Sequence, residues 1–482
     1  MTHDGRIQTI SRRAALGALA AAGAGFALFG PRRAGDAPAG RTVIDYWEKW
    51  TGQEGEAMGR VIDAFNRSQD RIWVRYFATS AIDQKALVSI AGNDPPALVG
   101  LWNFSLPMFV ESRAVMPLTE LDAAYGAEIS RAFAERGFAR DFRIRRENYT
   151  EPAWRIMHHR GVMGGVVNTC SSMAYYYDKS AYREVGLDPE QPPRTIAELD
   201  EHAERLTIMS GGKVERSGFL QREPGWWNWL WGYFFGGSLY DAETETATAA
   251  SPETVRGYEW VQSYPKKFGA QRLVAFQSGF GGYNSAQQAL LVGKVASVLH
   301  GPFLVNVIDR FKPGFDYGAA PFPVAEEIYD PDRPVGLLES DSLCIPRGCP
   351  HPREAYEFLM FTQLPENVEA LAIAHAKPTP LAHPSDDFIR RHPNKYVAMH
   401  NKLVASPRAF PKPLTRAWPQ YESEFNAEIG TMWELTRSAA DVLADIQRRA
   451  QRFIDVVVER RERRYGRDVA PGELLSGEGA QS

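Results

Sequence analysis

The sequence has few cysteines, no marked excess of charge of either sign and no long apolar run inside the main part of the chain. Only three of its 482 residues are cysteine, too few for a disulfide-stabilised scaffold. The 55 Lys and Arg residues nearly balance the 59 Asp and Glu residues, which argues against a broadly basic nucleic-acid-binding protein. The length and the 44% hydrophobic content indicate a globular chain with two large lobes or several domains.

Sequence motifs that carry catalysis or hold cofactors are also missing. There is no Gly-x-Ser-x-Gly elbow, no His-Glu-x-x-His sequence, no Walker phosphate loop and no Cys-x-x-Cys pair. The adjacent histidines His158 and His159 would face opposite ways on a strand, so they are poorly placed to share a metal ion. No pair of carboxylates stands out as a glycosidase couple. We therefore expect no catalytic residue, no metal and no cofactor.

The first 39 residues have the pattern of an export signal. Paired arginines in residues 11–13 precede a weakly hydrophobic Ala/Gly-rich run, residues 14–30, and residues 37–39 match an A-x-A cleavage site. This order is typical of a twin-arginine signal. The run is too short and too rich in glycine for a membrane span, and no nearby cysteine indicates a lipid anchor. We expect a soluble periplasmic protein; the alternative is a cytosolic protein with an alanine-rich N-terminal helix.

Two of the three cysteines lie close together. Cys344 and Cys349 are the first and last residues of the sequence Cys-Ile-Pro-Arg-Gly-Cys, and an oxidising periplasm would allow them to form a disulfide. The sequence leaves this pairing open, because the distance between the two Cα atoms decides it. Cys170 is expected to be a buried, small apolar residue.

Beyond the leader, short apolar runs alternate with helical periods. Residues 42–47 and 72–76 have the pattern of strands, residues 57–65 that of a helix, and residues 97–102 form a further apolar run. This order predicts a mostly parallel sheet covered by helices, with ligands bound outside the carboxyl ends of its strands. A second set of elements begins near Val162. No low-complexity linker separates the two sets, so we expect a stiff hinge that the chain crosses more than once.

Tryptophan is unusually frequent. The chain has twelve, roughly twice the average for its length, and four lie within residues 226–231. Trp47 and Trp50 follow the first predicted strand, and Trp102 follows the third. Sugar rings have apolar C–H faces and a rim of hydroxyls, so exposed aromatic rings beside polar groups indicate a carbohydrate site.

The alternative is that the aromatic residues belong to the core. We expect this for Trp229, Trp231, Phe234 and Trp433. For Trp102, and for Trp47 or Trp50, the position after the carboxyl end of a strand favours the ligand site.

Several motifs, in order, resemble those of the extracellular solute-binding proteins of family 1, the group that includes maltose-binding protein. They are residues 94–102 (Asp-Pro-Pro-Ala-Leu-Val-Gly-Leu-Trp), 116–121, 174–179, 185–187, 192–195, 293–296, 301–303 and 354–359. The likeness spans nearly the whole mature chain. The sequence departs from the family pattern at Asp178, Ile196 and Leu98, and residues 125–160 are longer and more basic than that pattern.

The resemblance implies an α/β, two-lobe periplasmic binding protein fold of type II, a Venus-flytrap with hinge strands and a C-terminal helical extension. It assigns residues 41–163 and 303–343 to the N-terminal lobe, and residues 168–298 and 350–482 to the C-terminal lobe. It also implies a monomer that captures a sugar in the cleft and delivers it to the permease subunits of an ABC importer. Binding of a glycerophosphodiester or polyol, an exported carbohydrate-active enzyme, and a sensory role remain alternatives.

The resemblance also places the ligand contacts. Trp102 resembles the stacking residue of the first lobe, Trp226 and Trp227 the aromatics of the second, and Trp418 or Tyr421 a third position. The candidate ligand-binding residues are Trp47, Glu48, Lys49, Trp50, Trp102, Asn103, Trp226, Trp227, Gly301, Glu339, Trp418 and Tyr421.

Overall fold

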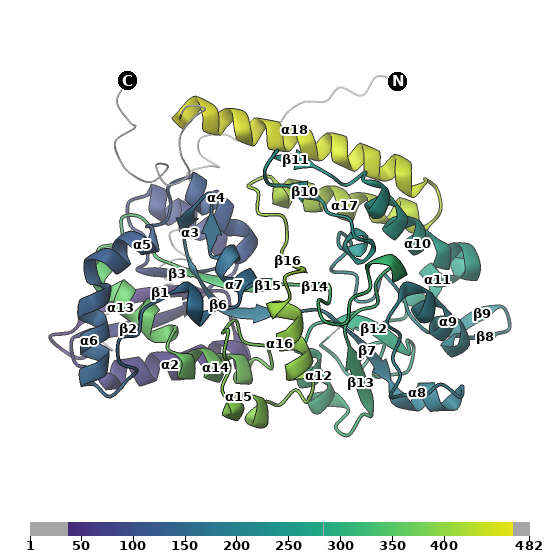
Figure 1. Ribbon diagram of the computed structural model, residues 1–482, viewed down its shortest axis with the longest axis horizontal. Helices are drawn as coiled ribbons and strands as arrows, with labels where there is room; N and C mark the ends of the chain where they lie inside the picture. Colours follow the sequence, from purple (N-terminus) through teal and green to yellow (C-terminus); the bar gives the residue numbers. More distant parts are fainter. Residues whose placement is uncertain (1–36, 283, 466–482) are drawn as a thin grey trace, which may run out of the picture.

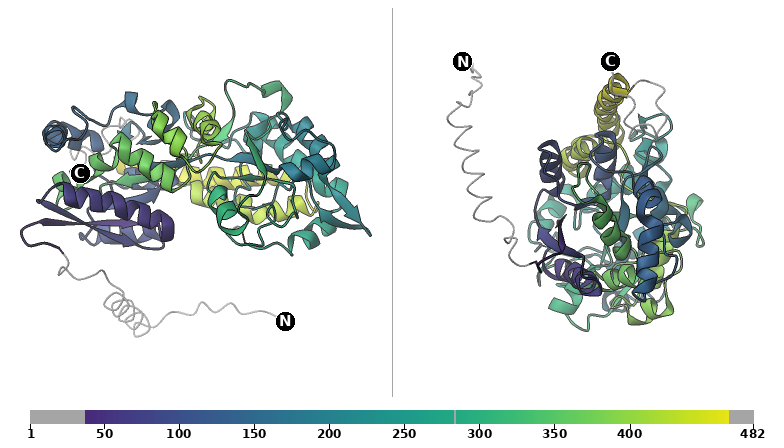
Figure 2. Two further views of the ribbon diagram at one scale, coloured as in Figure 1. Left: turned by 90° about the horizontal axis from the view of Figure 1, so that it is seen from below. Right: turned by 90° about the vertical axis from the view of Figure 1, so that its left-hand side faces the viewer.

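The computed structural model describes residues 37–282 and 284–465. Residues 1–36, which hold most of the predicted export signal, lie outside these ranges. Among the described residues, no helix is both long and apolar enough to cross a membrane. Two bodies, each with its own sheet and helices, lie side by side (Figures 1 and 2). We refer to them as the first and the second lobe.

The first lobe is built on a five-stranded sheet in the order β2-β1-β3-β15-β6. Its strands are β1 (Thr42–Glu48), β2 (Ile72–Ala78), β3 (Leu98–Trp102), β6 (Val166–Ser171) and β15 (Glu339–Cys344). The first three strands run parallel, as the sequence predicts, because helices return the chain between them. β15 lies antiparallel between β3 and β6, so a strand from far along the chain enters the middle of this sheet.

Helices and one short hairpin surround this sheet. They are α2 (Gly52–Ser68), α3 (Ile82–Ala91), α4 (Leu106–Glu111), α5 (Leu118–Leu121), α6 (Ala127–Glu135), α7 (Glu151–Ile156), β4 (His158–His159), β5 (Val162–Met163), α13 (Pro352–Thr362) and α14 (Pro365–Ala374). α2 buries Ala57, Val61, Ile62 and Phe65, the residues whose spacing predicts this helix.

The second lobe contains a three-stranded antiparallel sheet. β7 (Ala174–Asp178) lies in its centre, between β12 (Ser297–His300) and β13 (Tyr317–Ala320). The surrounding elements are α8 (Lys179–Glu184), α9 (Ile196–Leu206), β8 (Ile208–Ser210), β9 (Lys213–Arg216), β10 (Tyr240–Asp241), β11 (Thr246–Ala247), α10 (Pro252–Phe268), α11 (Ala270–Gln277), α12 (Leu304–Phe311) and α17 (Trp418–Trp433). α9 begins after Thr195, whose hydroxyl accepts a hydrogen bond from the Glu198 amide and so caps the helix.

The chain passes between the two cores more than once. It leaves the first lobe after β6 and returns at β15 through β14 (Gly336–Leu337), which pairs with β16 (Ala409–Phe410). It crosses again near α16 (Val397–Ala405), which follows α15 (Asp386–Arg391). α16 contributes Leu403 to the second core and Val404 to the first.

This packing differs from the predicted lobe boundaries in two segments. Residues 304–337, placed in the first lobe with 303–343, pack in the second core. Residues 355–371, placed in the second lobe with 350–482, pack in the first core. The reason is that the chain enters the first lobe only at β15 and then stays there through α13 and α14.

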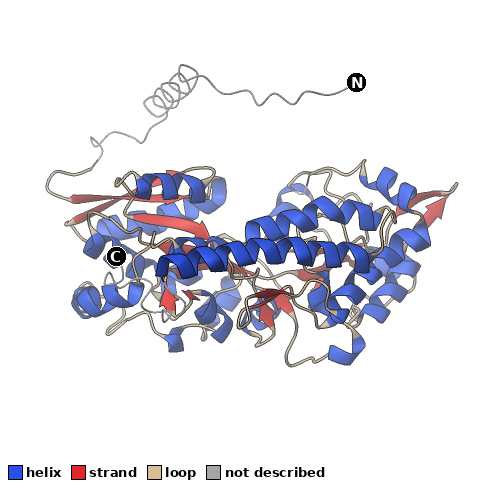
Figure 3. Ribbon diagram, turned by 90° about the horizontal axis from the view of Figure 1, so that it is seen from above, coloured by secondary structure: helices blue, strands red, loops and turns tan. Residues whose placement is uncertain are grey.

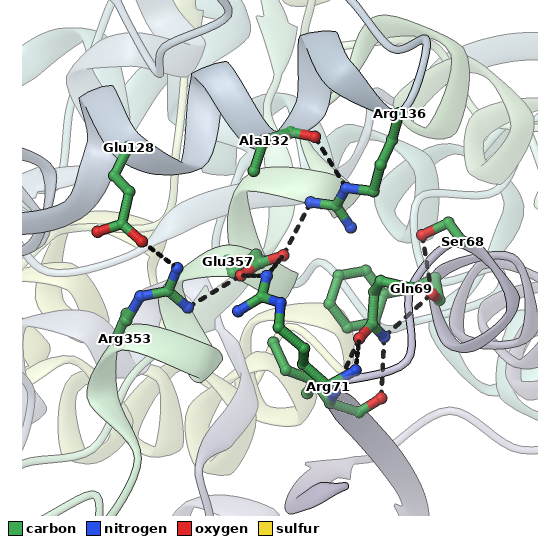
Figure 4. Close-up of polar contacts among 10 residues, drawn as sticks. Ser68, Gln69, Arg71, Glu128, Ala132, Arg136, Arg353 and Glu357 are labelled. Atoms are coloured by element: carbon green, nitrogen blue, oxygen red, sulfur yellow. Dashed lines mark hydrogen bonds and ion pairs between the residues drawn. The ribbon is translucent and has the colours of Figure 1, made fainter.

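A buried carboxylate fixes α13 to the first lobe (Figure 4). The side chain of Glu357 is fully buried and forms ion pairs with Arg71 (3.0 Å), Arg136 (2.8 Å) and Arg353 (3.1 Å). Arg136 belongs to the basic segment 125–160 that departs from the family pattern. One function of this segment is therefore structural.

The last helix, α18 (Ala439–Tyr465), extends across both lobes (Figures 1 and 3). Its first turns pack in the second core through Val442, Leu443 and Ile446. At its other end, the Tyr465 hydroxyl donates a hydrogen bond of 3.1 Å to the carbonyl of Glu111 in the first lobe. The predicted C-terminal helical extension thus spans the junction between the lobes.

The three cysteines are free, buried thiols. The pairing of Cys344 with Cys349, which the sequence leaves open, is not present in the structure. Cys170 is buried, as expected, and lies in the first core.

Candidate ligand-binding cleft

A cavity of about 450 Å³ opens between the lobes, at the carboxyl ends of β1 and β3. Ligands of parallel sheets bind outside the carboxyl ends of the strands, and the cavity lies at this edge. The first lobe, the second lobe and the segments that connect them all contribute. The lining residues are Trp50, Glu54, Trp102, Asn103, Phe104, Cys170, Ser171, Trp226, Trp227, Phe303, Leu338, Glu339, Ser340, Asp341, Lys377, Pro411 and Lys412.

Tryptophan side chains from both lobes line this cavity. Trp102, at the end of β3, is 47% exposed, and Trp226, from a loop of the second lobe, is 40% exposed. Trp227 packs edge-on against Trp226, with ring centres 5.4 Å apart, and its indole nitrogen donates to Glu339 over 3.4 Å. Large aromatic rings left open to solvent on facing surfaces are a feature of binding sites for ligands with flat apolar faces.

An ion-pair network lies beneath Trp102. The Lys49 ammonium is 3.0 Å from Asp341 and 3.1 Å from Glu48, and lies 4.6 Å from the centre of the Trp102 ring. Asp341 also accepts a hydrogen bond of 2.6 Å from Thr169. Burial alone would raise the pKa of Asp341, but the nearby ammonium groups and this hydrogen bond outweigh burial and hold the pKa at about 2.

The two lysines that line the cavity also have carboxylate partners. Lys377 lies 3.4 Å from Glu54 and 3.6 Å from Asp341. Lys412 lies 3.0 Å from Glu422 and 3.9 Å from Glu339. Because each of these ammonium groups is paired, the described residues of the cleft offer both donors and acceptors, and no lysine among them lacks a carboxylate partner.

Six of the predicted residues line the cavity. They are Trp50, Trp102, Asn103, Trp226, Trp227 and Glu339. Asn103 is held in place, since its amide donates to the Ile156 carbonyl and to Ser342. Glu48 and Lys49 are not among the lining residues; Lys49 lies behind the surface, paired with both Glu48 and Asp341.

The prediction is wrong for Trp418 and Tyr421. Both are fully buried in α17, inside the second core. The Trp418 ring packs edge-on against Trp229, and the Tyr421 hydroxyl donates to the Leu239 carbonyl. The core positions predicted for Trp229, Trp231, Phe234 and Trp433 are confirmed.

Trp47 and Gly301 are likewise absent from the lining. Trp47 packs against a separate apolar cluster that contains Leu101 and Phe109. Gly301 acts indirectly, because a Cβ at this position would come within 2.3 Å of the Phe303 ring. The glycine therefore leaves room for Phe303, which does line the cavity.

Sequence reasoning missed Glu54, Lys377 and Lys412. Each lies outside the motifs that carry the family resemblance, and the chain brings the two lysines to the cleft only after α14 and β16. Phe104 and Phe303 were also missed, although each lies within two residues of a predicted site residue.

Glu223, in the loop that carries Trp226, is expected to make the stability of the protein depend on pH. Burial raises the pKa of the Glu223 carboxyl from 4.5 to about 7. The folded state therefore favours the protonated form, whose stabilising effect is complete below about pH 4 and is lost as the pH rises to about 7. We expect the melting temperature of the wild type to fall, relative to that of Glu223→Gln, between pH 5 and pH 8. Thermal unfolding of both proteins at four pH values checks this; parallel curves would contradict it.

The fold and the cleft define a two-lobe binding protein. The chain belongs to the bacterial extracellular solute-binding protein family, whose model matches residues 49–369. This family and the relatives below are binding proteins, and the curated relatives are periplasmic. The sn-glycerol-3-phosphate-binding periplasmic protein UgpB of Escherichia coli strain K12 is 22% identical over 419 residues, which cover 81% of this chain and 88% of that protein.

Solved structures show the same fold. A structure entitled CpMnBP1 with mannobiose bound has a TM-score of 0.67 and 23% identity, covering 85% of this chain and 99% of that one. The sugar-binding protein MalE from Xanthomonas citri has a TM-score of 0.70 and 15% identity, covering 87% and 98%. UgpB from Mycobacterium tuberculosis in complex with glycerophosphocholine has a TM-score of 0.64 and 19% identity, covering 86% and 99%.

Proposed function

We propose that this protein is the periplasmic substrate-binding component of an ABC importer and that it captures an oligosaccharide in the cleft between its lobes. The observation that carries the proposal is the meeting of Trp102 from the first lobe with Trp226 and Trp227 from the second at one cavity. The twin-arginine signal in residues 1–39 would export it, and it would work as a monomer that delivers its ligand to the permease.

The mechanism is closure of the two lobes around the ligand. A sugar that contacts aromatic rings of both lobes binds the closed form more tightly than the open form, and so shifts the equilibrium between them. A shift from 1:99 to 99:1 needs a difference of about 5.5 kcal/mol between the two forms. Several stacked rings and charge-assisted hydrogen bonds together supply an energy of this order.

The paired lysines favour a neutral sugar over a phosphodiester. Lys49, Lys377 and Lys412 each have a carboxylate partner within 3.4 Å, so a phosphate would have to compete with these acidic groups. A hydroxyl group, by contrast, accepts from an ammonium and donates to a carboxylate in the same pair. The second candidate is a glycerophosphodiester or polyol, which the names of the UgpB relatives favour.

Calorimetric titration with mannobiose, mannotriose, maltotriose, sn-glycerol-3-phosphate and glycerophosphocholine tests the proposal. We expect saturable binding of at least one neutral sugar and none of the two phosphate compounds. Binding of a phosphate compound alone would favour the second candidate and overturn the first. New reducing ends after incubation with the oligosaccharides would instead indicate an enzyme.

A further inference from the structure

A second cavity, of about 670 Å³, adjoins the cleft. Residues 155–160 of the first lobe, residues 233–245 of the second lobe and residues 410–414 all contribute to its lining. Pro411 and Lys412 line both cavities, so the two spaces lie on either side of one short segment.

The lining combines an aromatic face with charged groups. The rings of Tyr233 and Phe410 are stacked with centres 4.0 Å apart and planes 5° from parallel. Around them lie Arg155, His158 and Arg160. An aromatic face beside polar groups is the combination that also suits the cleft to a sugar ring.

Ion pairs make most of this wall rigid. Glu245 is held between Arg160 (3.3 Å) and Arg461 of α18 (2.5 Å). His159 lies 2.9 Å from Glu111. Because these groups already satisfy one another, they shape the cavity and are not available to a ligand without loss of the pairs.

Arg155 is the exception among the cations of this wall. One of its guanidinium nitrogens donates to the Ala409 carbonyl over 3.1 Å, which fixes its position. Within the described part of the chain, no carboxylate lies within 4 Å of it, whereas Arg160 and Lys412 each have one. The Nδ1 atom of the neighbouring His158 lies 2.9 Å from the Trp154 carbonyl and donates to it, so Nε2 remains for another partner. The other carboxylate of the lining besides Glu245 is that of Glu243, which is exposed to solvent.

We propose that the second cavity receives the far end of the same ligand, and that this end carries a negative charge. This inference rests on the proposed function, which it extends from an oligosaccharide to an oligosaccharide with a terminal carboxylate or phosphate. The neutral rings lie in the cleft, where the cations are paired. The anionic group lies against Arg155, which lacks a carboxylate partner, and a guanidinium binds either anion through two parallel hydrogen bonds.

The test compares mannotriose and maltotriose with two derivatives of each: the aldonic acid, oxidised at the reducing end, and the 1-phosphate. We expect at least one acidic derivative to bind about tenfold more tightly than its neutral parent, with a preference that falls as salt is added. The better of the two derivatives identifies the anion.

The variant Arg155→Gln removes the charge, and it should abolish the preference while leaving neutral binding unchanged. The matched control is Arg146→Gln, an exposed arginine of the same basic segment that pairs with Glu151. Equal binding of neutral and acidic sugars, or a preference that survives in Arg155→Gln, would overturn this inference and leave the proposed function standing. Failure of all the sugars to bind would overturn the proposed function itself.

Discussion

Replacing Asp341 with alanine is expected to lower the free energy of unfolding by about 3 kcal/mol. The Asp341 side chain is buried and lies 3.0 Å from Lys49 and 3.6 Å from Lys377. Without it, two buried ammonium groups lose a shared partner, and the Thr169 hydroxyl loses its acceptor. Chemical denaturation of the two proteins at pH 7 measures the difference.

The control for this change is Asp45→Ala on β1. Asp45 pairs with Arg75 at 2.7 Å, but both side chains are partly exposed, so its loss should cost less than about 1 kcal/mol. Equal effects of the two substitutions would contradict the account. Because the pKa of Asp341 is held at about 2, its contribution is present above about pH 4 and is lost only as the pH falls towards 2.

Replacing Trp102 or Trp226 with alanine is expected to weaken sugar binding about thirtyfold, or ~2 kcal/mol, because tryptophans in contact with a ligand are frequent energetic hot spots. Both side chains are about half exposed, so the melting temperature of the free protein should change little. Calorimetric titration of each variant with the tightest-binding sugar gives the loss.

Trp73→Ala is the matched control for both substitutions. Trp73 lies on β2, at the edge of the first sheet, and is not part of the cleft lining. We expect it to leave the affinity unchanged. If Trp102→Ala weakens binding while neither Trp226→Ala nor Trp227→Ala does, the tryptophans of the second lobe do not bind the ligand, and ligand binding would not favour closure of the lobes through them.

The sequence predicts the parallel half of the first sheet well, because period-2 and helical patterns in residues 42–102 are local. It also predicts Trp102 at the site, because this residue ends a predicted strand of the sheet, and the family resemblance adds Trp226. The sequence predicts that the chain re-enters the first lobe at residue 303. In the structure it re-enters only at β15, which lies between β3 and β6. The placement of α13 in the first lobe depends on contacts such as those of Glu357 with three arginines, which lie far apart in the sequence.

Trp418 and Tyr421 show where a motif match misled. Together with Phe425 and Ile429 they recur at the spacing of one helical face, and this face is buried in the second core. The periodicity alone indicates a core stripe, and it should have outweighed the likeness to a family position. Lys377 and Lys412 had no local signal, because only the crossings between the lobes bring them to the cleft.

The most direct test is a crystal structure of the protein with the tightest-binding sugar of the calorimetric panel. The account predicts one sugar ring in contact with Trp102 of the first lobe, and the same ligand in contact with Trp226 or Trp227 of the second. A ligand bound outside this cavity, or held by the side chains of one lobe alone, would contradict it.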